Sequence, residues 1–258
     1  MTGLADIAVW MRDTGVLAGL VFLRIGAAMA LLPAFGEQVV PVRVRLGITV
    51  ALSALVLPLV GGIPLADPTP GPLMRMGAVE VLVGLALGLA FRVMVIALQV
   101  AGSIAAASTS LAQAFGAGLG ADPQPAISTL LVIAALALAC AAGLPVRVVE
   151  ALVLSYQLFP MGGAAPDGLI AAWAVADVAR AFALAFALAA PFAVAALVYN
   201  LALGAISRAM PQLMVVLIGA PALTLGSLVL MALAAPVLLS AWLAQFHGVL
   251  ADPFAAGR

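Results

Sequence analysis

The stretch "NLALGAISRAMPQLMVVLIGAP" (residues 200–221) lies within the most apolar part of the chain, yet it contains groups that hydrocarbon rejects. Asn200, Gly204 and Arg208 are spaced by four, so they share one face of a helix. The residue before Pro211 is biased away from helical geometry, and we expect the helix to end there. Arg208 then lies in the last turn, where it either contacts a partner or extends to the membrane edge.

The composition of the whole chain agrees with a membrane setting. Of the 258 residues, 66% are hydrophobic and 8% are charged, and the mean hydropathy is +1.30. A soluble domain carries roughly 25% charged residues. The ten basic residues are all arginine and are balanced by ten acids, so the formal net charge is zero. The composition therefore predicts a membrane protein that contacts lipid, and it excludes a basic face for nucleic acid.

The apolar stretches are long enough to cross a bilayer as helices. A spanning helix needs about 20 apolar residues, and no alternating pattern typical of a barrel strand appears. We predict an all-α membrane protein with about six such segments, and a single membrane domain over residues 1–258 without a soluble domain boundary. The segments are residues 14–36 (interrupted by Arg24 alone), 46–66, 93–121, 123–146, 181–207 and 209–246.

Prolines are expected to break several of these helices. Residues 209–246 would form a helix of about 57 Å, nearly twice the hydrocarbon thickness of about 30 Å. Broken helices at membrane depth are tolerated where protein covers them or where they line a wet cavity. The sequence therefore predicts kinked and broken helical hairpins packed in an assembly. The expected break points are Pro58, Pro160, Pro191, Pro211, Pro221 and Pro236.

Glu80, Gly84 and Gly88 repeat the spacing of four on another helix. Small residues at this spacing let a second helix approach closely, and a glutamate on the same face needs a partner there. Arg92 is roughly 18 Å further along the axis, so it cannot be that partner within one straight helix. We assign these three residues to subunit packing.

The loop "FGAGLGADP" (residues 115–123) invites two enzymatic readings. Its spacing is not that of a dinucleotide-binding loop, and no strand-to-helix unit surrounds it. It also approaches the G-x-G-D signature of intramembrane aspartyl proteases, with Asp122 and Asp177 as carboxylates, but Ala121 interrupts the motif. A glycine-rich connection between helices is the better supported reading.

Cysteine and histidine occur once each, as Cys140 and His247. A metal cage normally takes three or four such ligands, and a serine nucleophile needs a positioned base. We therefore predict no catalytic residue, no metal site and no cofactor.

Taken together, several stretches resemble the FliR family, the R component of the flagellar type III protein export gate, which has injectisome relatives. The similarities run in order from about residue 20 to residue 235. They comprise "VVPVRVRLGITVALSALVLP" (39–58), "EVLVGLALG" (80–88) followed by Ala101 and Gly102, Asp122–Pro123, "SYQLFPMG" (155–162), and Asn200, Leu201, Gly204, Arg208, Pro211, Gln212, Gly219 and Pro221.

The chain departs from the family pattern at a few positions. Relatives commonly carry Asn and Phe after the Pro-Gln-Leu, where this chain has Met214 and Val216, and Ser108 and Ser110 replace a usual Gln and Gly. The glycine loop also looks a few residues longer. These departures concern local contacts around the loop.

The resemblance implies a non-enzymatic subunit of a helical, cone-like pore. FliP-like and FliQ-like subunits would be its partners in that hetero-oligomeric assembly, and FlhB-like and FlhA-like exporter components would associate with it. Unfolded flagellar export substrates would cross the bacterial inner membrane through it at the flagellar basal body. In the family, a loop of the R subunit helps to close the pore. The residues at that position are Phe115, Gly116, Gly118, Gly120, Asp122 and Pro123.

A small-solute secondary transporter is the alternative, since it also explains discontinuous helices and buried charges. It requires coupling carboxylates deep in the spans, for which Glu80 is the candidate, and it predicts inverted repeats, which the sequence does not display. An intramembrane aspartyl protease is the third reading.

Overall fold

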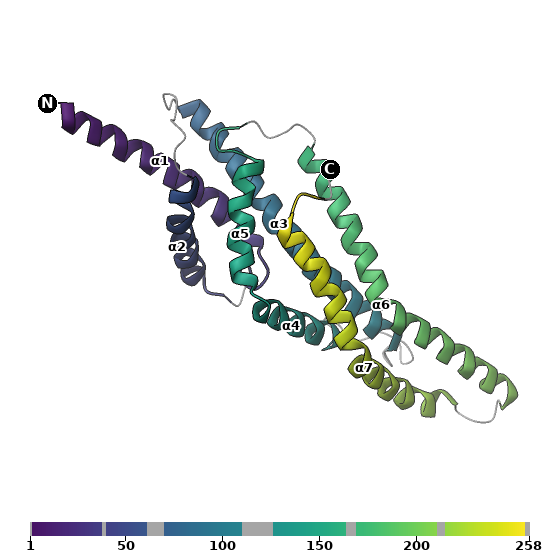
Figure 1. Ribbon diagram of the computed structural model, residues 1–258. Helices are drawn as coiled ribbons and strands as arrows, with labels where there is room; N and C mark the ends of the chain where they lie inside the picture. The colour runs from purple at the N-terminus through teal and green to yellow at the C-terminus, as the bar shows by residue number, and fades with distance from the viewer. Residues whose placement is uncertain are drawn as a thin grey trace. The chain divides into compact units, whose positions relative to one another are not determined.

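In the computed structural model the chain is helical, and no strand occurs in the residues that the structure describes: 2–37, 40–60, 70–109, 126–163, 169–210 and 215–255. This confirms the predicted all-α class. Figure 1 shows the helices in chain order. They are α1 (Thr2–Leu31), α2 (Val42–Val60), α3 (Pro70–Thr109), α4 (Ala126–Ala141), α5 (Leu144–Leu158), α6 (Leu169–Ala209) and α7 (Val215–Ala251).

The helices are long and apolar enough to cross a membrane. Within the described ranges, five helices meet that test, and six spans result if the broken pair α4–α5 counts as one. This agrees with the six predicted segments. Helix α3 has 40 residues and α6 has 41, so each is about 60 Å long at 1.5 Å per residue. Each is therefore about twice as long as a hydrocarbon core of about 30 Å is thick.

The prolines divide the helices only in part as predicted. Helix α5 ends at Leu158, before Pro160, and α6 ends at Ala209, before Pro211. At the other positions the prediction was wrong, because the helix continues through the proline. An interior proline removes one backbone hydrogen bond, a loss that neighbouring helices can compensate in a membrane protein. The uninterrupted positions are Pro58 in α2, Pro191 in α6, and Pro221 and Pro236 in α7.

One break was not predicted. The sequence predicts a single span over residues 123–146, but α4 ends at Ala141 and α5 begins at Leu144. Gly143, between them, has φ 88° and ψ 25°, a left-handed conformation that glycine adopts without steric cost. Pro145 in the first turn of α5 suits a helix start, since its missing N–H would have no partner there.

The chain divides into two compact units, described separately below. The first comprises residues 1–93, 140–177 and 247–258, and the second comprises residues 94–139 and 178–246. Helices α3, α4, α6 and α7 contribute residues to both. The single domain over residues 1–258 stays a prediction.

In the first unit, the C-terminal end of the chain packs into the core. The Trp173 indole N–H donates to the Pro253 carbonyl oxygen at 2.9 Å. The Phe254 ring lies 4.9 Å from that of Phe159 and 5.1 Å from that of Trp173, centroid to centroid. Trp173, Pro253 and Phe254 are buried, so this aromatic cluster fixes the chain after α7.

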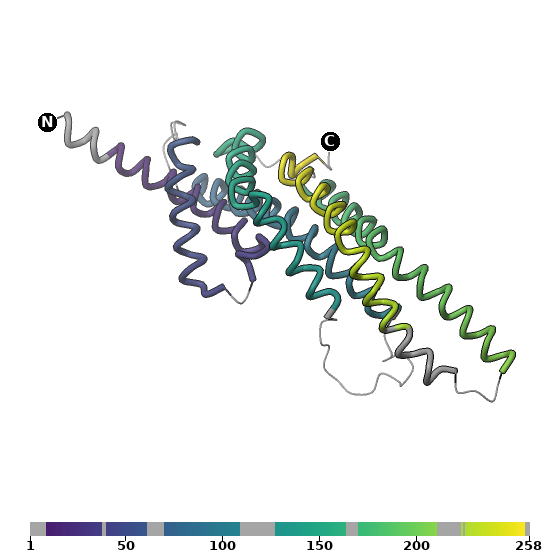
Figure 2. Tube along the Cα trace, turned by 60° about the horizontal axis from the view of Figure 1, so that its bottom comes forward, coloured from purple at the N-terminus to yellow at the C-terminus, as the bar shows by residue number. Residues whose placement is uncertain are grey.

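In the second unit, α6 and α7 run side by side (Figures 1 and 2). Trp242 of α7 is fully buried; it stacks on Phe246 at 4.7 Å, and its indole N–H donates to the Met94 carbonyl oxygen of α3 at 2.9 Å. A buried indole needs such an acceptor, so this bond fixes α7 against α3.

Candidate functional site

A fully buried ion pair joins α1 and α3 in the first unit. The Arg24 Nε donates to Glu80 Oε2 at 2.5 Å and Nη2 donates to Oε1 at 3.0 Å, with both side chains 0% exposed. This bidentate geometry matches the planar guanidinium to the carboxylate. Arg24 is therefore the partner that the sequence required for Glu80. The signal available in the sequence was Arg24 itself, the single charge in an otherwise apolar run.

Helix α5 completes the surroundings of the arginine. Nη2 also donates to the Phe159 carbonyl oxygen at 2.9 Å, and Nη1 donates to the Ser155 hydroxyl at 3.3 Å. The guanidinium carbon lies 3.8 Å from the centre of the Tyr156 ring, a cation–π contact. One cation thus joins three helices. A buried charge with this many partners fixes the relative positions of the helices that supply them.

Gly84 and Gly88 allow α1 to approach α3 next to this pair. A Cβ atom at Gly84 would overlap the Arg24 carbonyl oxygen, and one at Gly88 would lie 2.6 Å from the Ala28 carbonyl oxygen. The predicted close approach is therefore present. The assignment of Glu80, Gly84 and Gly88 to subunit packing needs correction, because α1 of the same chain occupies their face.

A second polar cluster holds the turn after α1. Arg45 donates through Nε to the Phe35 carbonyl oxygen at 3.0 Å and through Nη2 to the Glu37 carbonyl oxygen at 2.9 Å. The Glu37 carboxylate forms an ion pair with Arg92 of α3. Arg45 and Arg92 therefore both bind residues that follow α1, and Arg92 has a partner other than Glu80.

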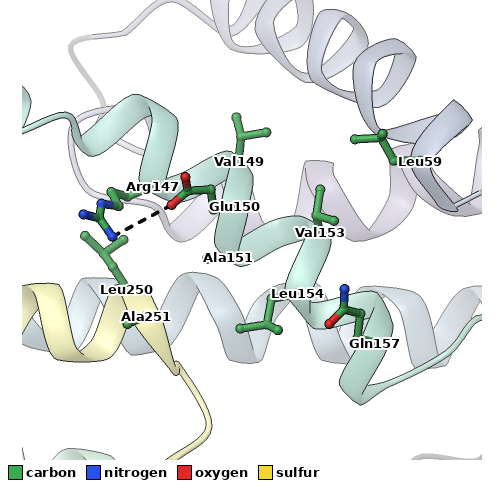
Figure 3. Close-up of a pocket in the computed structure, with 10 residues that line it drawn as sticks. All are labelled: Leu59, Arg147, Val149, Glu150, Ala151, Val153, Leu154, Gln157, Leu250 and Ala251. Carbon is green, nitrogen blue, oxygen red and sulfur yellow. Dashed lines mark ion pairs between the residues drawn. The ribbon is translucent and has the colours of Figure 1, made fainter.

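A shallow groove of about 570 Å³ runs along α5 in the first unit (Figure 3). Arg147 and Glu150 lie at one end, 4.0 Å apart, with more than half of each side chain exposed. The remaining lining is mainly apolar and includes Leu59 of α2 and Leu250 of α7. A half-exposed, single-turn ion pair contributes little energy and is no catalytic arrangement.

The last turns of α6, in the second unit, are largely exposed. From residue 197 to residue 209 the structure describes no buried residue. Asn200, Gly204 and Arg208 are all exposed, and no atom lies within 4 Å of the position of a Cβ at Gly204. The face that the spacing of four predicted is therefore open in this chain, and most of the residues around it are apolar.

Several predicted residues lie beyond what the structure describes. The whole loop assigned to pore closure, Phe115, Gly116, Gly118, Gly120, Asp122 and Pro123, falls outside the described residues, as do Pro211 and Gln212. Gly219 and Pro221 lie in α7, within a part whose side chains are not described. Their roles stay predictions.

The described residues bring together no catalytic or metal-binding constellation. They contain no group of three His, Cys, Asp or Glu side chains that could hold a metal ion. Asp177, the second carboxylate of the protease reading, is buried within α6, and His247 lies near the C-terminal end of α7. In the first unit, a buried ion pair holds the helices together. In the second unit, the long apolar helix α6 carries exposed polar residues on one face.

These features define the chain as an all-helical membrane protein. Comparison with known sequences identifies the group. A family model described as "Bacterial export proteins, family 1" matches residues 16–249, and the chain belongs to this family, among its FliR members.

Three curated relatives carry the name "Flagellar biosynthetic protein FliR". The protein of Caulobacter vibrioides is 33% identical over 237 residues, which cover 90% of this chain and 94% of the relative. The protein of Bacillus subtilis is 29% identical, with 78% of this chain and 79% of the relative covered. The protein of Pectobacterium carotovorum is 29% identical, with coverage of 81% and 80%.

Proposed function

We propose that the chain is a non-catalytic subunit of the flagellar type III protein export gate in the bacterial inner membrane, at the flagellar basal body. With FliP-like and FliQ-like subunits it forms the pore through which unfolded flagellar substrates leave the cytoplasm. FlhB-like and FlhA-like exporter components associate with this gate.

The observation that carries this proposal is the exposed end of helix α6. Helix α6 is about 60 Å long by its residue count, and its last thirteen residues (197–209) include none that is buried. Lipid can cover the apolar side chains of this stretch, which is about 20 Å long. Asn200 and Arg208, on one exposed face of the helix, need polar partners there, which the other chains of a multi-subunit pore supply.

The surroundings of Glu80 argue against the alternative function, a small-solute transporter. A coupled transporter needs a carboxylate that can exchange an ion or proton during its cycle. Glu80, the candidate from the sequence, is held by two hydrogen bonds from Arg24 with no exposed surface. A carboxylate in this position serves packing.

Coexpression tests the proposal. We expect the chain to aggregate in detergent when it is produced alone, because its long apolar faces are uncovered. Produced with FliP-like and FliQ-like subunits of the same organism, it should be recovered with both as one monodisperse complex. A monodisperse, cooperatively unfolding monomer that binds neither subunit contradicts the proposal.

A further inference from the structure

The groove along α5, in the first unit, has two charged residues at one end and a mainly apolar lining beyond them (Figure 3). Its volume of about 570 Å³ lies within the range of roughly 300–1,000 Å³ that is typical of sites for small organic ligands. Three helices form it, because Leu59 near the end of α2 and Leu250 and Ala251 at the end of α7 line it together with α5. The groove is therefore a site on the folded first unit and not a feature of one helix.

The length of the groove matches one leaflet of a bilayer. Arg147 and Gln157 line its two ends and are ten positions apart on α5, which corresponds to about 15 Å along the axis. Half of a hydrocarbon core of about 30 Å is also about 15 Å. Apart from Glu150, the α5 residues that line the groove between these ends are apolar: Val149, Ala151, Val153 and Leu154. This lining suits one acyl chain that lies along the helix.

The charged end of the groove favours a particular headgroup. Arg147 and Glu150 are 4.0 Å apart, and their side chains are 52% and 63% exposed. An ion pair this exposed contributes little energy, so a ligand that separates the two charges loses little by doing so. The guanidinium then matches the oxygens of a phosphate with parallel N–H donors, and the carboxylate accepts hydrogen bonds from an ammonium group. A phosphate and a primary ammonium joined by an ethylene link form the headgroup of phosphatidylethanolamine.

We propose that the α5 groove binds one phospholipid of this zwitterionic class. Its phosphate binds Arg147, its ammonium donates to the Glu150 carboxylate, and one acyl chain lies along Val153 and Leu154. Helix α5 forms with α4 a bent pair that is long and apolar enough to count as a membrane span, so this part of the chain meets lipid. Phosphatidylglycerol, which has the phosphate but no ammonium, satisfies the arginine alone. The site does not depend on the export function proposed above.

Photocrosslinking tests the site in the complex that is purified with this chain, whatever that complex transports. The complex is reconstituted in phosphatidylcholine vesicles that contain a trace of phosphatidylethanolamine with a diazirine in one acyl chain. After illumination, mass spectrometry should place crosslinks on residues 149–154. Unlabelled phosphatidylethanolamine should displace the probe about fivefold more effectively than phosphatidylglycerol, which is the effect that one exposed ion pair supplies.

Two variants and a matched control separate this site from lipid that surrounds any membrane protein. Val153→Trp should fill the groove and remove the crosslinks on α5, whereas Val146→Trp should leave them in place, because Val146 is exposed on the same helix and does not line the groove. Glu150→Gln keeps the shape of the side chain and removes its charge. It should retain the crosslinks and abolish the preference for phosphatidylethanolamine.

Three results overturn the proposal. If no crosslink falls on residues 149–154 in the unchanged complex, another chain covers the groove. If Val153→Trp and Val146→Trp keep the same crosslinks, the lipid lies outside the groove. If the two unlabelled lipids displace the probe equally, the charged pair does not select the headgroup. The last result needs only the unchanged chain, so it decides the matter even if Val153→Trp fails to assemble.

Discussion

Arg24 of α1 and Glu80 of α3 are 56 residues apart in the sequence, yet their side chains form a two-bonded ion pair with no exposure to solvent. Removing one partner of such a pair strands a buried charge, which typically costs about 3–5 kcal/mol, whereas replacing both with apolar residues is often nearly neutral. We expect Glu80→Ala and Arg24→Ala each to reduce the thermal stability of the purified complex. The double variant Arg24→Met/Glu80→Leu should be more stable than either. A double variant as unstable as the sum of the singles contradicts this view of the pair.

The close approach of α1 to α3 predicts a strong effect at Gly84. A leucine there would collide with the backbone of α1 at Arg24. Overpacking of this kind costs about 1–3 kcal/mol or more. Gly84→Leu should lower the recovery of folded complex, measured by size-exclusion chromatography.

Gly19 provides the matched control, because it is exposed on α1 and no atom lies within 4 Å of its Cβ position. Gly19→Leu should be recovered like the unchanged chain. Equal losses for both variants would indicate a general intolerance of leucine rather than a close helix contact.

The exposed face of α6 predicts a loss of partner binding. Gly204→Leu should block close approach of a partner helix, and Arg208→Ala should leave the group that the arginine contacts unpaired. An interhelical hydrogen bond in a membrane is worth about 1–2 kcal/mol, so we expect about a tenfold weaker recovery of partners with Arg208→Ala. Ala205→Leu adds the same bulk about 100° around the helix and serves as the control. Normal assembly and motility with both variants would mean that Arg208 only extends to the membrane edge.

The glycine loop predicts a leak. Phe115 supplies an apolar group that can exclude water from a narrow passage, and the glycines that follow it make the backbone permissive. Deleting residues 116–120 should leave assembly intact and raise ion conductance in cells that produce the complete complex. Asp122→Asn should be mild because asparagine can still cap a helix, whereas an aspartyl protease would lose all activity. Unchanged conductance with normal assembly removes the closing role of the loop.

The sequence predicted those parts of the fold that depend on composition and local spacing. The apolar segments gave the class and number of spans, and Pro160 and Pro211 marked true helix ends. The helix continues through the other four prolines, Pro58, Pro191, Pro221 and Pro236. Helix propensities measured in water overstate the cost of an interior proline within packed apolar helices. The helices that compensate for the hydrogen bond lost at each proline come from other parts of the chain, so the local sequence does not reveal them.

The buried site was predicted in part for a similar reason. The spacing of Glu80, Gly84 and Gly88 predicted a close helix contact, but spacing alone does not identify the helix that makes it. The partner, Arg24, lies on α1, and the Phe159 carbonyl group that completes its surroundings lies just beyond α5. Contacts over such sequence separations follow from tertiary packing, so a single sequence could not assign them.

Secretion of flagellar proteins tests the central claim, that this chain is part of the export gate, most directly. Cells that lack the chain should release no hook or filament protein into the medium, and expression of the unchanged chain should restore release. The Arg24→Ala variant should restore less, and a variant without residues 116–120 should restore release while cells become leaky to ions. Undiminished secretion in cells that lack the chain, with loss of uptake of a small solute instead, would contradict the gate and favour the transporter.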